Sequence, residues 1–366
     1  MKRINLMTVA GARPNFIKIA PLADEIALRE GIEHFLVHTG QHYDANLSHL
    51  FFEQLGIPEP DTNLGVGSGS HAVQTAEIMK AFEPVLCEQR PDCVIVVGDV
   101  NSTIACTLVA VKLGVPVAHV EAGLRSFDRT MPEEINRMLT DRIADYLFVT
   151  EQSGADNLAA EGVPRDRVFF TGNVMIDTLL KHLEKARTLD IMGRFGVKQN
   201  QFGLVTLHRP SNVDNESTLR GILDAFAGIS QNYDLILPLH PRTAASVDRF
   251  GLQDKLKSIG RTKTTEPLGY LEFLNLMSNA RFVLTDSGGI QEETTILGVP
   301  CFTLRENTER PVTITHGTNT LTGPDPARIL EAFSKLDSKP QPGSSPPLWD
   351  GKAAGRIIDI LAEKLQ

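Results

Sequence analysis

The sequence predicts an α/β protein built from two doubly wound domains. Short apolar runs, of the length of buried strands, alternate with longer amphipathic runs that are typical of helices. This alternation favours parallel sheets whose strands are joined by crossover helices, and it begins a second time near Gly203. The length of 366 residues also fits two domains, because single cores rarely grow beyond roughly 250–300 residues.

The expected elements follow from these runs in chain order. In the first half we expect strands over 4–10, 33–39, 93–97, 117–120 and 146–149, and helices over 14–29, 72–88 and 102–112. In the second half we expect strands over 203–207, 235–239, 281–285 and 299–303, and helices over 217–230 and 271–278. The predicted domains span 1–172 and 173–351, and a C-terminal helix over 352–366 could pack back on the first domain. The glycine-rich stretch 65–70 and the proline-rich stretch 337–350 are expected to be loops.

Composition argues against several classes of protein. The formal net charge of −9 disfavours a nucleic-acid-binding surface, which would be basic. The 4 cysteines form no Cys-x-x-Cys pair, so we expect reduced thiols in the cytoplasm and neither a zinc site nor disulfides. No apolar run approaches the roughly 18 residues of a membrane span, and the first apolar stretch is better interpreted as a strand than as a signal peptide.

The most informative stretch is 282–293, with the sequence Phe-Val-Leu-Thr-Asp-Ser-Gly-Gly-Ile-Gln-Glu-Glu. A buried strand breaks at a turn formed by Ser287, Gly288 and Gly289, and a helix follows. Backbone N–H groups at such a helix N-terminus can hold a phosphate, and Glu293 could accept hydroxyls of an attached sugar. The alternative is an ordinary strand-to-helix turn whose glycines allow tight packing, which is common in α/β proteins.

Polar residues follow several expected strands, at the edge where active sites of open α/β sheets lie. Arg13 and Lys18 follow the first strand and could supply positive charge to a diphosphate. Alternatively, Arg13 caps a helix and Lys18 is solvated. Asp99 follows the strand 93–97 and is either a helix N-cap, the commoner use of aspartate there, or a catalytic carboxylate.

The segment 121–137 carries a high density of charged residues. Pro132 fits a first helical position, where an acidic residue such as Glu133 favours the helix dipole. Glu121, at a strand end, has no comparable structural explanation. We therefore hypothesise that Asp99, Glu121 and Glu133 converge at one sheet edge, where neighbouring carboxylates can supply both a general acid and a general base.

Histidines with nearby arginines end two successive strands of the second half, at His208 and His240. A single histidine at a strand end is more often structural, but two such pairs beside a phosphate turn favour anion binding. The segment from Arg305 to Pro311, which includes Arg310, follows the strand 299–303 and adds another arginine that could face a nucleotide.

These segments together resemble the non-hydrolysing UDP-N-acetylglucosamine 2-epimerases over nearly the whole chain. The order and number of the motifs make the resemblance specific. The matching motifs are 11–15, 39–42, 98–103, 121–125, 132–137, 208–209, 286–293 and 308–311. The resemblance implies a Rossmann-like fold of the glycosyltransferase-B type, with a UDP-sugar in the interdomain cleft and no metal or cofactor. It also implies a cytoplasmic homodimer, with no membrane or nucleic-acid partner, that serves cell-surface polysaccharide biosynthesis.

The reaction implied by the resemblance is a reversible inversion at C2 that interconverts UDP-GlcNAc and UDP-ManNAc. UDP leaves as the C2 proton is removed, which gives 2-acetamidoglucal, and UDP then adds back while a proton reaches the opposite face. Glu293 is implied at the ribose and Phe273 beside uracil. The implied catalytic residues are Asp99, Glu121, Glu133 and His208. The implied UDP-sugar-binding residues are Arg13, Lys18, Arg137, His240, Phe273, Ser287, Gly288, Gly289, Glu293 and Arg310.

The chain departs from the family pattern at two places. After His208, many members carry a glutamate and an asparagine or serine where this chain has Pro210-Ser211-Asn212, so contacts near His208 are expected to differ. The segment 41–44 (Gln-His-Tyr-Asp) differs from that of members activated by their own substrate, which predicts weak or absent allosteric activation. It also resembles relatives that act on UDP-2,3-diacetamido-glucuronate. That substrate stays an alternative, as do a hydrolysing epimerase and a transferase of the same fold.

Overall fold

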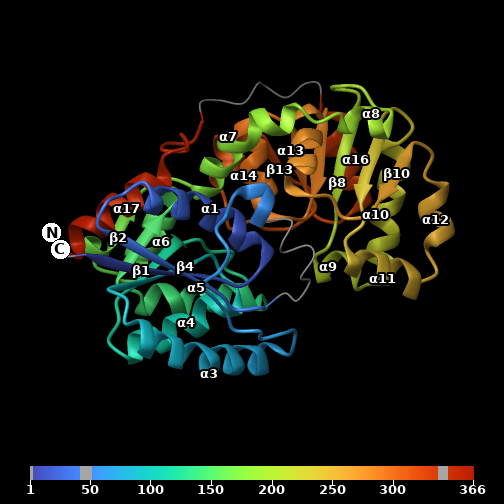
Figure 1. Cartoon of the computed structure of the whole chain (residues 1–366). Helices are drawn as coiled ribbons and strands as arrows, with labels where there is room; N and C mark the ends of the chain where they lie inside the picture. The colour runs from blue at the N-terminus through green and yellow to red at the C-terminus, as the bar shows by residue number, and fades with distance from the viewer. Residues whose placement is uncertain (1–2, 42–51, 337–344) are drawn as a thin grey trace. The chain divides into compact units, whose positions relative to one another are not determined.

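The computed structural model describes residues 3–41, 52–336 and 345–366. The chain divides into two compact units, one formed by Met1–Lys181 with Pro347–Gln366 and the other by His182–Pro346. This division falls inside α7 (Val174–Arg187). In each unit the described strands form a parallel sheet with helices between them (Figure 1). The predicted fold class, two doubly wound α/β domains, is confirmed.

In the described part of the first unit, the strand order is β3-β2-β1-β4-β5-β6-β7. The strands are β1 (Ile4–Ala10), β2 (Ile32–His38), β3 (Thr62–Asn63), β4 (Cys93–Val97), β5 (Val117–Ala122), β6 (Tyr146–Val149) and β7 (Val168–Phe170). Between and after them come α1 (Arg13–Ala27), α3 (His71–Gln89), α4 (Asn101–Lys112), α5 (Pro132–Ile143), α6 (Gln152–Ala160), η1 (Arg165–Arg167) and α17 (Ala353–Lys364). Helices α3, α4 and α5 pack in a row on one face of the sheet, and α1 packs against α17 on the other (Figure 1).

In the described part of the second unit, the strand order is β10-β9-β8-β11-β12-β13. The strands are β8 (Phe202–Thr206), β9 (Asp234–Pro238), β10 (Thr262–Thr265), β11 (Phe282–Thr285), β12 (Cys301–Thr303) and β13 (Asn319–Leu321). The helices are α8 (Ile191–Phe195), α9 (Pro210–Val213), α10 (Glu216–Ile229), α11 (Pro241–Arg249), α12 (Gln253–Ser258), α13 (Tyr270–Asn279), α14 (Gly288–Leu297), α15 (Val312–Thr315) and α16 (Pro326–Ser334).

In each sheet the strand order reverses direction once along the chain. The candidate sites are expected at these two reversals. In the first unit the reversal lies between β1 and β4, and in the second between β8 and β11. At such switch points the connections on either side go to opposite faces, which opens a crevice at the carboxyl ends of the strands. The sheet topology therefore directs attention to the residues that follow β1, β4, β8 and β11.

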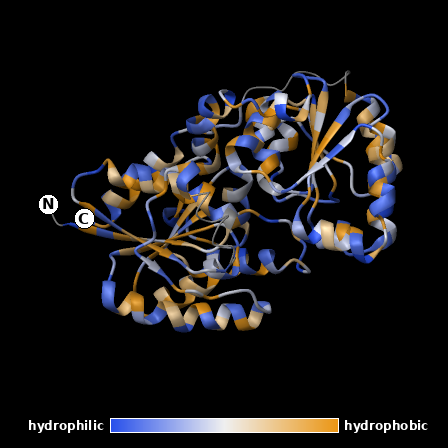
Figure 2. Ribbon diagram, turned by 45° about the vertical axis from the view of Figure 1, so that its right-hand side comes forward, coloured by the Kyte–Doolittle hydropathy of each residue, from blue (hydrophilic) through white to orange (hydrophobic). Residues whose placement is uncertain are grey.

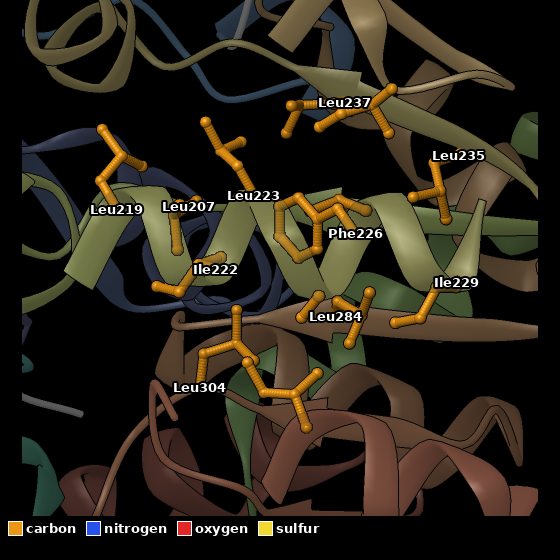
Figure 3. Close-up of a cluster of buried hydrophobic side chains, with 14 of the residues drawn as sticks. Leu207, Leu219, Ile222, Leu223, Phe226, Ile229, Leu235, Leu237, Leu284 and Leu304 are labelled. Atoms are coloured by element: carbon orange, nitrogen blue, oxygen red, sulfur yellow. The ribbon is translucent and has the colours of Figure 1, made fainter. Parts of the chain in front are cut away.

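Hydrophobic periodicity explains the cores. Every residue of β4 is buried, as expected for a central parallel strand covered on both faces. In α10, the buried side chains of Leu219, Ile222 and Phe226 recur at helical spacing and pack with Leu235 and Leu284 of the sheet (Figure 3). Coloured by hydropathy, the strands are largely apolar while the helices carry polar residues on their outer sides (Figure 2). Each such buried side chain contributes about 1.5–3 kcal/mol to stability.

The expected elements are present at nearly the predicted bounds, whereas several short strands were not predicted. Those strands are β3, β7, β10 and β13. The stretch 65–70 contains no helix or strand, as expected, and Ser70 caps α3. Helix α17 belongs to the first unit, where the two carboxylate oxygens of Asp177 accept the N–H groups of Ala353 and Ala354 at 3.1 and 2.7 Å.

Candidate functional site

The carboxyl ends of β1, β4 and β5, which are neighbouring strands, carry the polar residues predicted for the first unit. Lys18 lies in α1, directly after β1, and Asp99 lies in the turn after β4. Glu121 lies near the end of β5. These positions surround the switch point between β1 and β4, where a ligand is expected.

Glu121 forms a buried ion pair with Lys18. Each residue is only 5% exposed, so the alternative of a solvated lysine is wrong. The pair lies against the backbone of Gly98, because a Cβ atom there would come within 2.9 Å of Lys18 Nζ and 3.5 Å of Glu121 Oε2. Gly98 also has a φ of +66°, so a side chain at this position would strain the backbone as well as crowd the ion pair.

The backbone of Glu121 is itself unusual. Its φ of +75° lies in the left-handed region, which residues other than glycine rarely adopt. The register between β5 and β6 shifts between Val120 and Ala122, so Glu121 occupies a bulge. Bulges and strained residues gather at functional sites, where they aim a side chain. The local strain supports a functional role for Glu121.

Asp99 is held by a salt bridge and does not cap a helix. Arg137 donates from Nε and Nη2 to Asp99 Oδ2, at 3.0 and 2.8 Å. The N-cap of α4 is Val100, which makes no side-chain cap bond, so the interpretation of Asp99 as an N-cap is wrong. Asn136 of the same helix as Arg137 donates to the carbonyl oxygen of Asp99 at 2.9 Å. Helix α5 therefore fixes both the backbone and the carboxylate of Asp99.

The adjacent glutamates of α5 have different environments. Pro132 is the first residue of the helix, as predicted. Glu134 is 1% exposed and accepts the backbone N–H groups of Ser126 and Phe127 as well as a salt bridge from Arg137. Glu134 is thus an anchor for the preceding loop. Glu133 is half-buried in the first helical turn, so its carboxylate is the one partly open to solvent.

In the second unit, His208 after β8 and Asp286 after β11 are joined across the switch point. Asp286 is buried and lies 2.9 Å from His208 Nδ1, and it accepts the backbone N–H groups of His208 and Arg209. Burial alone would raise the pKa of Asp286, but the bonds from His208 and Arg209 outweigh it and lower this pKa. An ionised Asp286 fixes the proton on Nδ1, so His208 would meet a ligand through Nε2. Asn212, part of the departure from the family pattern, also donates to Asp286 at 3.1 Å.

The predicted phosphate turn, Ser287 to Gly289, forms the N-terminus of α14. Ser287 is the N-cap and makes no side-chain cap bond. A Cβ atom on Gly288 would come within 2.6 Å of Arg310 Nη1, so this position requires glycine while Arg310 is in place. The guanidinium of Arg310 is held by Glu292 at 2.8 Å and Glu309 at 2.6 Å. Arg310 and the turn are therefore neighbours, as the motif suggested for a diphosphate site.

Glu293 lies one helical turn further along α14 and is buried against Tyr270. The Tyr270 hydroxyl donates to Glu293 Oε1 at 2.9 Å. Burial raises the pKa of Glu293 to about 7, the hydrogen bond from Tyr270 opposes this rise, and the charge of Glu292 adds to it. Burial likewise raises the pKa of Tyr270. Glu293 therefore exchanges a proton near neutral pH, unlike an ordinary glutamate.

The remaining predicted residues of the second unit lie in different environments. His240 is an exposed N-cap of α11, and its ring centre lies 5.4 Å from that of His208. Phe273 is half-buried in α13, on the same helix as Tyr270. Arg305 is 7% exposed and bound to Glu309, at 2.8 Å.

Parts of three predictions lie outside the described part of the chain, and one of them is the loop expected over 337–350, of which 337–344 are not described. Arg13 begins α1, but its side chain is not described. Residues 42–44, on which the prediction about allosteric activation depends, lie outside the described residues. Their neighbour Gln41 is buried and accepts the N–H of Ser102 at 3.1 Å. The described residues include no group of three His, Cys, Asp or Glu side chains that could hold a metal ion.

A family model described as UDP-N-acetylglucosamine 2-epimerase matches residues 24–362. The chain belongs to the UDP-N-acetylglucosamine 2-epimerase family. The UDP-N-acetylglucosamine 2-epimerase of Methanocaldococcus jannaschii is 44% identical over 363 residues, which cover 98% of this chain and 99% of that protein. The resemblance inferred from the motifs is confirmed.

Solved structures and curated relatives extend the comparison. The crystal structure of the Methanocaldococcus jannaschii UDP-GlcNAc 2-epimerase in complex with UDP-GlcNAc and UDP matches with a TM-score of 0.93 and 43% identity, over 98% of this chain and 100% of that one. The Neisseria meningitidis enzyme bound to UDP-GlcNAc matches with a TM-score of 0.90 and 32% identity, over 98% and 100%. The UDP-2,3-diacetamido-2,3-dideoxy-D-glucuronate 2-epimerase of Pseudomonas aeruginosa is 40% identical, over 98% and 100%. The relatives of this epimerase are thus named for more than one UDP-sugar.

Sequence reasoning missed side chains that organise both parts of this epimerase family member. Asn15 accepts the N–H groups of Gly11 and Ala12 and donates to the carbonyl of Val97, at 3.1 Å, so it ties the end of β1 to that of β4. Its place in the motif 11–15 was a usable signal. Tyr270 precedes Glu293 by 23 residues, and no local pattern marks it as the partner of that carboxyl.

None of the helices in the described part of the chain has both the length and the hydropathy needed to cross a membrane.

Proposed function

We propose that the protein catalyses the reversible C2 epimerisation that interconverts UDP-GlcNAc and UDP-ManNAc. The observation that carries this proposal is the presence of two carboxylates at neighbouring strand ends, Asp99 and Glu121, each held by a buried cation. Two positioned carboxylates can serve as general acid and general base on either face of one carbon. The 44% identity to an enzyme named for UDP-N-acetylglucosamine supports the choice of sugar.

The second unit offers groups suited to UDP. Backbone N–H groups at the start of α14 could bind an anion at the helix N-terminus, where the helix dipole is positive. Arg310 beside Gly288, and His208 through Nε2, would add hydrogen bonds to the diphosphate. Glu293 would accept the ribose hydroxyls. The N–H groups of α14, Arg310 and His208 would stabilise the negative charge that grows on UDP as it leaves.

The proposed steps balance in atoms and electrons. A carboxylate of the first unit removes the proton from C2, and the C2–H electron pair forms the C1–C2 double bond. The C1–O bond breaks at the same time, and UDP leaves with its electron pair. UDP then returns to C1 while a proton is delivered to the opposite face of C2. Because the C2 hydrogen is not beside a carbonyl group, the departure of UDP must supply most of the driving force.

A solvent-exchange experiment tests the proposal. The protein is incubated with UDP-GlcNAc in D2O, and the products are followed by NMR. Appearance of UDP-ManNAc with deuterium at C2 supports the reaction. Stoichiometric free ManNAc and UDP would instead show a hydrolysing epimerase, and absence of turnover without an added acceptor would favour a transferase or another sugar.

A second candidate substrate is UDP-2,3-diacetamido-glucuronate. The observation in its favour is the 40% identity to the Pseudomonas aeruginosa enzyme, close to the identity found for the Methanocaldococcus jannaschii relative. The chemistry at C2 would be the same, so the carboxylates keep their roles. Comparing kcat/KM for the two UDP-sugars decides between them. A ratio above about tenfold, equivalent to about 1.4 kcal/mol in transition-state binding, would identify the preferred substrate.

A further inference from the structure

A buried charged network lies directly behind Asp99 and Glu121. His119 of β5 and Asp141 of α5 are both completely buried, and His119 Nδ1 lies 2.6 Å from Asp141 Oδ1. The other ring nitrogen, Nε2, lies 2.8 Å from the carbonyl oxygen of Gly98. Burial of this kind requires that every polar atom find a partner. None of these side chains has a part in the reaction proposed above.

The hydrogen-bond partners determine how many protons His119 carries. The carbonyl oxygen of Gly98 can only accept, so Nε2 donates to it. Asp141 also accepts from Arg125 Nη1 at 2.7 Å and from the N–H of Gly123 at 3.0 Å. Burial would raise the pKa of Asp141, but its interactions with His119 and Arg125 outweigh burial and lower it. An ionised Asp141 can only accept, so each ring nitrogen of His119 faces an acceptor.

This network holds the backbone on both sides of Glu121. Asp141 binds His119, two residues before Glu121, and Gly123, two residues after it. Between these two anchors Glu121 keeps its left-handed backbone and its bulge. Strained residues persist only where their surroundings fix them, and Asp141 supplies such a fixation.

The same network also fixes the turn that carries Asp99. His119 Nε2 binds the carbonyl of Gly98, the residue directly before Asp99. The Lys18–Glu121 pair lies against the same glycine. One imidazole therefore connects the backbone segments that carry both candidate carboxylates.

We propose that Asp141 and a doubly protonated His119 position the carboxylates of Glu121 and Asp99 for the C2 chemistry. Both are positioning residues, because they act on the backbone beside the carboxylates. The catalytic part of this inference rests on the proposed function, whereas the protonation of His119 does not. Misplaced carboxylates slow the chemical step, and UDP binding by the second unit is left unchanged.

Asp141→Asn is the variant that tests the positioning role. The amide has the same size, its oxygen can accept from Arg125, and its NH2 group can donate to His119 Nδ1, so the ring loses one proton. We expect kcat to fall about tenfold to a hundredfold, while KM changes by less than about threefold. Asp145→Asn is the matched control, because Asp145 accepts the N–H of Val117, at 2.9 Å, at the opposite end of the same strand. The control should keep the wild-type kcat.

Nitrogen-15 NMR of the imidazole rings tests the protonation without substrate. In the wild-type protein at neutral pH both ring nitrogens of His119 should show protonated shifts, and in Asp141→Asn one ring nitrogen should show an unprotonated shift. A neutral ring in the wild type, or equal losses of kcat in Asp141→Asn and Asp145→Asn, would overturn the proposal. If Asp141→Asn does not fold, His119→Gln, which keeps one amide donor, should show the same fall in kcat at constant KM. Absence of UDP-sugar turnover in the wild type would count against the proposed function, and the NMR result would still decide the state of His119.

Discussion

Two buried carboxyl groups near the start of α14, Asp286 and Glu293, have pKa values that are shifted in opposite directions. Asp286 accepts hydrogen bonds from His208 and from the backbone, and these outweigh burial and lower its pKa. Burial raises the pKa of Glu293 to about 7, the charge of Glu292 adds to this rise, and the single hydrogen bond from Tyr270 only partly opposes it. Hydrogen bonds to the charged form, rather than depth of burial, decide which carboxyl stays ionised.

The raised pKa of Glu293 makes stability depend on pH in a defined direction. The folded-state value of about 7 lies above the ordinary 4.5, so the folded protein binds the proton more tightly. The stabilisation from this proton is complete below about pH 4.5 and is lost as the pH rises through about 7. The difference between the two pKa values corresponds to about 3 kcal/mol.

Glu293→Gln should remove this dependence. The free energy of unfolding of the variant, relative to wild type, should increase between pH 5 and pH 8, as measured by urea denaturation at both values. Glu331→Gln, at an exposed glutamate of α16, is the control. Its free energy of unfolding relative to wild type should be the same at both pH values. A relative stability of Glu293→Gln that is the same at both pH values would contradict the assignment.

Asp99→Asn and Glu121→Gln should reduce turnover far more than UDP affinity. Each amide keeps the shape of the carboxylate but cannot take a proton, so kcat should fall by about 10² to 10⁴. The dissociation constant of UDP, measured by calorimetry, should stay within about threefold, because the proposed UDP groups lie on the second unit. Near-normal turnover in both variants would remove the two carboxylates from the mechanism.

At the same scale, the roles of single residues were predictable only where a local motif marks them. The motif around Ser287 predicted a turn at a helix N-terminus, and the structure has it. The alternative of Asp99 as an N-cap was wrong because α4 begins after Val100 and because Arg137, 38 residues away, binds the carboxylate. No pattern around Asp99 contains that contact.

Elements were predictable where their own residues supply the burial. The central strands β4 and β11 consist of buried residues and are evident from the sequence. By contrast, β10 has the sequence Thr-Lys-Thr-Thr and β3 only two residues, so neither has an apolar run. Both are strands because a neighbouring strand offers its free backbone groups, β9 to β10 and β2 to β3. That information is tertiary.

The N-terminus of α14 supports a prediction about glycine. A Cβ atom on Gly288 would displace Arg310, because the two would come within 2.6 Å. Gly288→Ala should therefore weaken UDP binding by about tenfold or more while the protein stays folded, as measured by calorimetry and thermal unfolding. Gly260→Ala is the matched control in the same unit, since its nearest neighbour atom would be 4.0 Å away. Equal UDP affinities in the two variants would show that the turn does not bind the diphosphate.

At the scale of the whole molecule, each unit repeats one architectural principle. A doubly wound parallel sheet reverses its strand order once, and the polar residues gather after the strands at that reversal. The alternation of apolar and amphipathic runs was enough to predict this class, because it requires no knowledge of long-range pairs. The homodimer implied by the resemblance stays a prediction, which sedimentation velocity can test.

The proposed reaction requires that one ligand engage both units, and hydrogen–deuterium exchange can detect this. UDP alone should slow amide exchange at the start of α14 and around His208, where we place the diphosphate. UDP-GlcNAc should slow exchange there and also around Gly98 and Glu121 of the first unit, because the proposed carboxylates act on the sugar. Helix α12, which precedes β10 and follows no strand of the switch point, should be unchanged by either ligand. If UDP-GlcNAc protected the second unit alone, the carboxylates of the first unit could not be acting on its sugar.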